Sequence, residues 1–341
     1  MGERSIVVTA RVVKEKVILE TERLREANVV KMLFTITILS IFVFYCYSNY
    51  TKRIEKYASW KNKLQTFDPK KDGDVDEIIK FVVGYDFPFE MFLVLNFVSY
   101  RTFCSPTIAG VYAKTGGIVN DTDKRACDTD LLMHIWMDYG LDSTIHGLHS
   151  AKTRNVDFVF VIACLVIDSI QFANDYGWRS IEEKEKQAIW EFYRRVGERM
   201  EIKDLPKNLE DCYKIVDKYT EDERSARITE DGIALTEAIT KLVCQWYYFI
   251  PQSIIRTAVS VVIYQMGATF QRKLGLTKPT FVQSLFVNTI LQIRRALLNV
   301  VPLRTEPYKL SDIIMRSDYG CPISKDTIKK VGPVDALARI Q

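Results

Sequence analysis

Histidine is scarce in this chain of 341 residues, with only three copies, His134, His146 and His149. Any metal site that uses imidazole must therefore draw on one of these three side chains. The seven cysteines are widely spaced, and no two of them form a Cys-x-x-Cys pair. This spacing excludes a zinc ribbon, a thioredoxin-type redox motif and a covalently attached c-type haem, and it favours reduced thiols.

Turn-forming residues and net charge are low as well. The chain has 15 glycines and 10 prolines, which favours helices over a turn-rich β architecture. Lys and Arg number 47 against 43 Asp and Glu, a net charge of +4 that gives no footprint for nucleic acid. A hydrophobic content of 48% excludes a disordered chain, while a mean hydropathy of −0.05 argues against many membrane spans.

Several catalytic signatures are also missing from the sequence. It has no Glu-x-x-His motif, which excludes the ligand set of a ferritin-like di-iron bundle. It has no His-Glu-x-x-His motif, no Gly-x-Ser-x-Gly elbow and no glycine-rich phosphate loop. Zincin-type metalloproteases, α/β-hydrolases and P-loop nucleotide-binding proteins are therefore excluded as templates.

One long apolar run is present near the N-terminus. Residues 27–47 read ANVVKMLFTITILSIFVFYCY, and Lys31 is the only charged residue among them. At 1.5 Å per residue such a helix covers about 31 Å, close to the hydrocarbon thickness of a bilayer. A cleaved signal peptide is the competing interpretation, but about 26 mostly polar residues come first and no small-residue cleavage site follows. We therefore predict a single transmembrane anchor.

The charges that flank this anchor indicate its orientation only weakly. Three basic residues lie among the fifteen before Met32 and four among the fifteen after Tyr47, with further lysines beyond. By the positive-inside rule this favours a cytosolic C-terminal domain. Two glycosylation sequons begin at Asn49 and Asn120, and they matter only if that domain is lumenal.

The sequence predicts five segments: a polar segment at 1–26, the anchor at 27–47, a polar linker at 48–80, a helical domain at 81–310 and a tail at 311–341. No strand alternation or internal repeat persists in the helical domain. Helices are expected at 89–98, 131–137, 156–173, 181–200, 208–220, 231–249, 252–274 and 279–300.

The run Val156–Ala173 is apolar enough to be mistaken for a second span. It contains Asp157 and Asp168, and each carboxylate would cost roughly 2.5–3.5 kcal/mol near the centre of a membrane helix. We therefore predict a buried helix of a soluble bundle. In the next helix, Ser180 followed by Glu183 predicts a capping box.

His146 and His149 are three residues apart, so on a helix they share one face. Such a pair can bind a metal with help from other ligands, or it can be structural or exposed. A single histidine among apolar helices can also supply the axial ligand of a haem iron. That use requires cations for the propionates and an apolar slot for the macrocycle, and the residues alone leave these alternatives open.

In order and spacing, a set of short motifs resembles the ER-bound oxygenase mpaB/rubber oxygenase family from about Pro88 to the stretch at 319–333. The motifs are Tyr100-Arg101-Thr102-Phe103 with Pro106, Thr115-Gly116, Arg125-x-x-Asp128-Thr129, Ile145-x-x-Leu148-His149, Tyr176-Gly177-Trp178-Arg179, Gly197-x-x-Met200-x-Ile202, Leu205-Pro206 and Tyr319-Gly320. The resemblance implies an all-α, globin-like helical bundle that holds haem b and follows a single N-terminal transmembrane helix.

The resemblance also implies roles for individual residues. His149 matches the proximal iron ligand, and Arg125 and Thr129 match the arginine and threonine of the distal pocket. Asp128 stands where rubber-cleaving members carry a lysine that can cap the iron, so an open or water-bound iron is expected here. Asp128 is either a catalytic base or the partner of Arg125 in an i,i+3 ion pair. His146 is interpreted as a surface residue or one that tunes the site.

Lys152 and Arg154 follow the expected ligand closely, so they are either solvated or in contact with a propionate. The implied reaction is the cleavage of a carbon–carbon double bond in a lipophilic, isoprenoid-like substrate with O₂, at the endoplasmic reticulum membrane. The alternatives are a non-catalytic haem-binding membrane protein and a helical scaffold without haem. The sequence predicts no oligomeric state.

Overall fold

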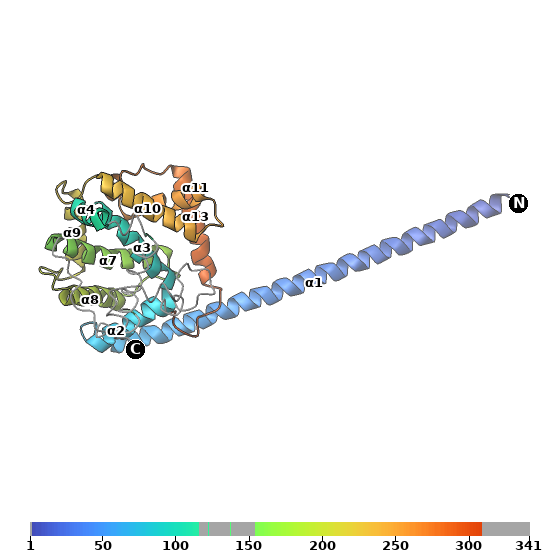
Figure 1. Cartoon of the computed structure of the whole chain (residues 1–341). Helices are drawn as coiled ribbons and strands as arrows, with labels where there is room; N and C mark the ends of the chain where they lie inside the picture. Colours follow the sequence, from blue (N-terminus) through green and yellow to red (C-terminus); the bar gives the residue numbers. More distant parts are fainter. Residues whose placement is uncertain (1, 116–121, 123–136, 138–153, 309–341) are drawn as a thin grey trace, which may run out of the picture. The chain divides into compact units, whose positions relative to one another are not determined.

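The computed structural model describes residues 2–115, 122, 137 and 154–308 (Figure 1). The chain divides into two compact units. The first contains residues 1–58 and 299–303, and the second contains residues 59–298 together with the chain from 304 onwards. Each unit is described by itself below.

The first unit is dominated by helix α1, Gly2–Thr66, whose last turns belong to the second unit (Figure 1). Its stretch from Asn28 onwards contains a window of mean hydropathy 2.2 in which no residue is buried. This confirms an apolar N-terminal helix long enough to cross a membrane. Just beyond the predicted span, the Asn49 amide donates to the Val300 carbonyl at 3.0 Å. Arg53 donates to the carbonyl of the following residue, Val301, at 3.2 Å.

The segment 48–80, predicted as a polar linker, is mostly helical in the structure. Helix α1 continues to Thr66, and α2, Asp72–Phe81, leads into the π-helix η1, Val82–Asp86. The physical reason is a buried face that the polar composition conceals. Trp60 is buried, its ring stacks on Phe81 at 3.7 Å, and its Nε1 donates to Glu185 at 2.8 Å.

Helix α7, Asn155–Tyr176, is the centre of the second unit, where it packs against α3, α8, α9 and α13. Its most apolar window is 78% buried, which confirms the prediction of a buried helix at 156–173. Helix α3, Pro88–Phe103, is its main partner and begins with a proline in the first turn, where no backbone donor is required.

The remaining helices surround this pair. Their bounds are α4 Pro106–Thr115, α8 Glu183–Arg199, α9 Leu209–Glu221, α10 Glu230–Trp246, α11 Gln252–Met266, α12 Ala268–Lys273 and α13 Phe281–Leu298. Among the residues that the structure describes there is no β-strand, so the all-α prediction is confirmed.

Two local predictions were wrong. The helix expected at 252–274 is broken at Gly267, whose φ of 150° a residue with a side chain rarely adopts. The capping box lies two residues beyond Ser180, because Glu182 is the N-cap of α8 and its N–H donates to the Glu185 carboxylate at 2.8 Å. Glu185 is held there by its bonds to other helices, and these outweigh the local capping signal.

Candidate functional site

The predicted site residues Arg125, Asp128, Thr129 and His149 lie outside the residues that the structure describes, as do the other two histidines. In sequence they belong to the connection between α4, which ends at Thr115, and α7, which begins at Asn155. Within the described ranges, no group of three or more His, Cys, Asp or Glu side chains is arranged to hold a metal ion. The helices that precede and follow this connection in sequence, α4 and α7, are described.

A buried hydrogen-bond network joins α9 to the first turn of α7 and to the residue before α4. The Tyr219 hydroxyl, on α9, lies 2.6 Å from Asp157 Oδ1 in the first turn of α7. It also lies 2.8 Å from the Oγ of Ser105, the residue before α4. A phenol has one proton, which goes to the carboxylate, so the serine hydroxyl donates the second bond. The network thus holds the start of α4 and the start of α7 to one side chain of α9.

The role of this network is structural, since its tyrosine does not ionise at neutral pH. Burial and the Asp157 carboxylate both raise the pKa of the Tyr219 phenol, so the phenol stays protonated at neutral pH. Its ring stacks on Phe160 of α7 at 3.9 Å. Sequence reasoning missed this cluster, since Tyr219 is 62 residues from Asp157 and 114 from Ser105. The one available signal was a carboxylate inside an apolar helix.

Arg154 also contributes to the start of α7. Its guanidinium binds the Asp157 carboxylate with two bonds, at 3.0 Å from Nε and 2.6 Å from Nη2. The side chain is still partly exposed, so its charge is shared between solvent and an ion pair. Of the two sequence interpretations of Arg154, solvated or propionate-binding, neither included this pairing. Lys152 lies outside the described residues.

The first motif residue with a clear role is Arg101, which links α3 to α7. Its guanidinium donates to both oxygens of the buried Asp168, at 2.7 and 2.8 Å, and to the Met266 carbonyl at 3.0 Å. Burial alone would lower the pKa of Arg101, but Asp168 outweighs that effect and raises it. The pair therefore holds the two central helices together as an ionised unit.

A second motif residue, Arg179, joins the loop after α7 to η1 and α8. It donates to Asp86 at 2.7 Å and to both oxygens of the buried Glu185, each at 2.7 Å. Its neighbour Gly177 has no space for a side chain, because a Cβ there would lie 2.5 Å from the Phe87 ring. The motif residues that the structure describes thus hold α3 to α7 and η1 to α8.

The buried cysteines are unsuited to thiolate chemistry. Burial raises the pKa of the Cys104 and Cys212 thiols to about 12, and that of Cys164 well above its ordinary value. Thiolates would thus be rare at neutral pH at these three positions. This agrees with the sequence-based interpretation of reduced, chemically inactive cysteines.

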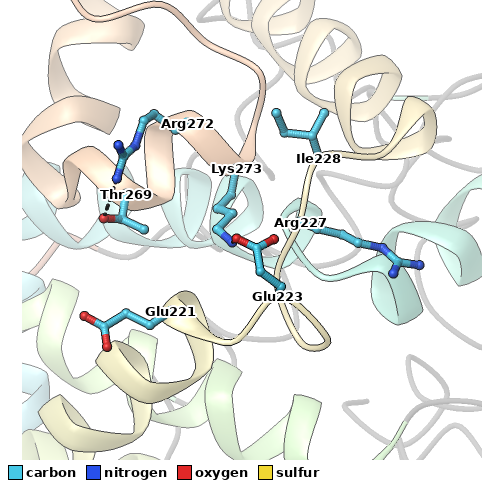
Figure 2. Close-up of a pocket in the computed structure, with 7 residues that line it drawn as sticks. All are labelled: Glu221, Glu223, Arg227, Ile228, Thr269, Arg272 and Lys273. Atoms are coloured by element: carbon cyan, nitrogen blue, oxygen red, sulfur yellow. Dashed lines mark hydrogen bonds and ion pairs between the residues drawn. The ribbon is translucent and has the colours of Figure 1, made fainter.

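A surface pocket of about 690 Å³ lies among α9, the loop after it and α12 (Figure 2). Its lining carries charges of both signs, and Lys273 pairs with Glu223 and donates to the Ala226 carbonyl at 2.9 Å. A haem macrocycle needs a long apolar slot. The polar lining of this pocket does not meet that requirement. The residues that line it are Glu221, Glu223, Arg227, Ile228, Thr269, Arg272 and Lys273.

The chain is similar to three characterised fungal proteins. It is 25% identical over 146 residues to the ER-bound oxygenase mpaB of Penicillium roqueforti, covering 38% of this chain and 49% of that protein. It is 24% identical over 170 residues to mpaB of Penicillium brevicompactum, covering 44% and 43%. It is also 24% identical over 146 residues to mpaB' of the same species, covering 38% and 34%. The chain thus spans about half of the length of these relatives or less.

Residues 146–295 match the profile of the ER-bound oxygenase mpaB/B'/rubber oxygenase catalytic domain. The match is shorter than the stretch from Pro88 to residue 333 over which the motifs suggested a resemblance. It includes His149 and helices α7 to α12, while Arg125, Asp128 and Thr129 precede it. Residues 146–295 of this chain are thus similar to the ER-bound oxygenase mpaB/B'/rubber oxygenase catalytic domain, in the family profile and in the fungal relatives.

Proposed function

We propose that this protein is a membrane-anchored, haem b-dependent oxygenase that cleaves carbon–carbon double bonds of a lipophilic, isoprenoid-like substrate with O₂. The observation that carries the proposal is the match of an oxygenase catalytic domain that includes His149, in a chain with an exposed apolar N-terminal helix. An oxygenase held at a membrane has direct access to a substrate that dissolves in lipid.

The donor set of the predicted site suits a b-type haem. His149 would hold the haem iron through its imidazole, Arg125 would supply a cation for oxygen or a propionate, and Thr129 would supply a hydroxyl donor. Haem iron supplies the binding and activation of O₂. Asp128, as a carboxylate, does not replace the amine that caps the iron in rubber-cleaving members. This leaves the distal side accessible to O₂ and substrate.

The described helices support this site by fixing the starts of α4 and α7, the helices that precede and follow the segment that contains it. Asp157 and Ser105 are joined through Tyr219, and Arg101 fixes α3 to α7. A ligand-bearing segment between two fixed helix ends loses less conformational entropy when it orders around a cofactor. The proposed role of these residues is therefore to position the segment.

The anchor at 27–47 is proposed to cross the endoplasmic reticulum membrane once, with the catalytic domain in the cytosol. The names of the fungal relatives include the words ER-bound, and the apolar helix is present in this chain. The balance of basic residues around the helix favours the cytosolic orientation.

The test is product formation under oxygen-18 gas by the full-length protein in microsomes supplied with a polyunsaturated isoprenoid alcohol. Cleavage of one double bond by one O₂ gives two carbonyl fragments, each with one labelled oxygen atom. The matched control is His149→Ala. Labelled carbonyl fragments that disappear in the control support the proposal. A haem spectrum without turnover of such substrates indicates a haem-binding protein, and a colourless protein after haem supplementation indicates a scaffold.

A further inference from the structure

Helix α13 has one face fixed to the second unit. Its Arg294 donates to the buried Glu90 at 2.7 Å and to the Tyr176 carbonyl at 3.1 Å, and it lies over the Phe89 ring at 4.0 Å. Gln265 of α11 donates to the amide oxygen of Asn288 at 2.6 Å. These contacts hold the helix against α3, α7 and α11 in a single orientation.

The opposite face of α13 is apolar and exposed. Seven large apolar side chains follow the helical repeat along it, with exposed fractions from 47% to 80%. No charged residue separates them, because the only charges in the helix are Arg294 and Arg295. A continuous apolar stripe of this size on a folded protein marks a surface that another apolar phase covers. The stripe consists of Phe281, Val282, Leu285, Phe286, Ile290, Ile293 and Leu297.

The covalent chain limits how far this helix can be from the membrane. Helix α13 ends at Leu298, and residues 299–303 belong to the first unit, where Asn49 and Arg53 of α1 bind the Val300 and Val301 carbonyls. Two residues of extended chain span at most about 7 Å. Asn49 itself is two residues beyond the predicted span, or about 3 Å along the helix. The C-terminal end of α13 is therefore tethered close to the hydrocarbon boundary.

A second copy of the chain is a less suitable occupant of this face. A helix of 18 residues is about 27 Å long and about 10 Å wide, which gives a footprint on the order of 300 Å². Stable protein interfaces bury about 800 Å² on each partner. A bilayer surface has no such requirement, because the anchor already holds the chain on it.

We propose that the apolar stripe of α13 lies in the interfacial layer of the membrane, as a second membrane contact that does not span. The geometry is that of an interfacial amphipathic helix, with the apolar stripe towards the acyl chains and the polar side towards protein. The turn between α10 and α11 exposes Tyr248 and Phe249, and α11 packs on α13. Aromatic side chains of this kind favour the membrane–water interface. The contact restrains the catalytic domain at the lipid surface.

The test measures lipid contact in the full-length protein reconstituted into nanodiscs. A nitrobenzoxadiazole fluorophore is attached at Leu285→Cys or, separately, at Ile293→Cys, both exposed positions of the stripe. The matched control is Asp217→Cys, an exposed position of α9. Labelling of the unsubstituted protein gives the background from native cysteines. The nanodiscs contain phosphatidylcholine with or without bromine atoms on the acyl chains.

We expect brominated lipid to quench the probes on α13 about twofold, with blue-shifted emission, and to leave the α9 probe unchanged. Quenching at α13 that equals the quenching at α9 would overturn the proposal. A blue shift without quenching by bromine would also overturn it, because it would show that protein covers the stripe. The result is independent of haem content and of oxygenase activity.

Discussion

The hydroxyl of Tyr219 lies 2.6 Å from the carboxylate of Asp157, and this contact joins α9 to the first turn of α7. The same hydroxyl binds Ser105 at the start of α4, so one side chain links the two helices that precede and follow the segment with the predicted haem ligand. The consequence is a stable frame around that segment, built by residues that are remote in sequence.

Tyr219→Phe removes this contact and keeps the ring that stacks on Phe160. We expect the loss of about 1–3 kcal/mol of unfolding free energy, because a buried carboxylate loses one of its donors. The measurement is the midpoint of thermal or denaturant unfolding in detergent. Tyr213→Phe on the exposed side of the same helix is the matched control, with an expected change below about 0.5 kcal/mol. Equal effects of the two changes would contradict the role of Tyr219.

Arg101 and Asp168 give a second test of the helical frame. Arg101→Met leaves a buried, unpaired carboxylate and should cost about 3–5 kcal/mol. The double variant Arg101→Met with Asp168→Leu should recover most of that loss, because both charges are then absent. Unfolding midpoints of the single and double variants measure the difference. If the double variant is no more stable than Arg101→Met, the loss of stability comes from lost packing and not from the unpaired charge.

Glu191 predicts a dependence of stability on pH. Burial alone would raise the pKa of its carboxyl, but hydrogen bonds from Arg194 and Arg195 outweigh burial and lower the pKa below the ordinary 4.5. A lowered folded-state pKa stabilises the protein above the unfolded pKa, and this contribution is lost as the pH falls through the folded pKa. We expect Glu191→Gln to lower stability by about 1 kcal/mol at neutral pH. The unfolding midpoints of Glu191→Gln and of the unsubstituted protein should converge as the pH falls from 7 to 3. A difference between the two proteins that stays constant over this range would contradict the prediction.

The proposed topology predicts accessibility in sealed microsomes. Protease added outside should digest the catalytic domain of the full-length protein, because that domain is assigned to the cytosol. Protection of the domain, or a glycan at Asn120, would place it in the lumen instead. A glycan at Asn49 is not expected in either orientation, because its amide is buried and donates to the Val300 carbonyl.

The sequence correctly predicted that α7 is buried in protein, because its two carboxylates, Asp157 and Asp168, are incompatible with lipid. In the structure Asp168 binds Arg101, and Asp157 binds Arg154 and Tyr219. The helical structure of residues 48–80 was not predicted, because many polar residues there concealed the buried face that contains Trp60 and Val75.

Long-range pairs escaped prediction for another reason. The contacts of Tyr219 and Arg179 join residues up to 114 apart, and the periodicity of one helix carries no information on which helix will cover it. The predicted ligand His149 and its distal neighbours remain predictions, since they lie outside the described residues.

Asp128→Lys tests the distal side of the predicted site. If residue 128 faces the iron, a lysine amine there should bind it and change the haem spectrum to a six-coordinate, low-spin form. An unchanged spectrum would place residue 128 away from the distal face and would favour an ion pair with Arg125.

The most direct measurement is the visible absorption spectrum of the purified full-length protein and of three variants, His149→Ala, His146→Ala and His134→Ala, each expressed with added haem precursor. The proposed ligand predicts a Soret band that is lost in His149→Ala, because no neighbouring side chain can replace an axial imidazole. His146→Ala should show at most a modest loss, and His134→Ala should keep the band. A protein without a Soret band, or one in which His149→Ala keeps the band and His146→Ala loses it, would contradict the assignment.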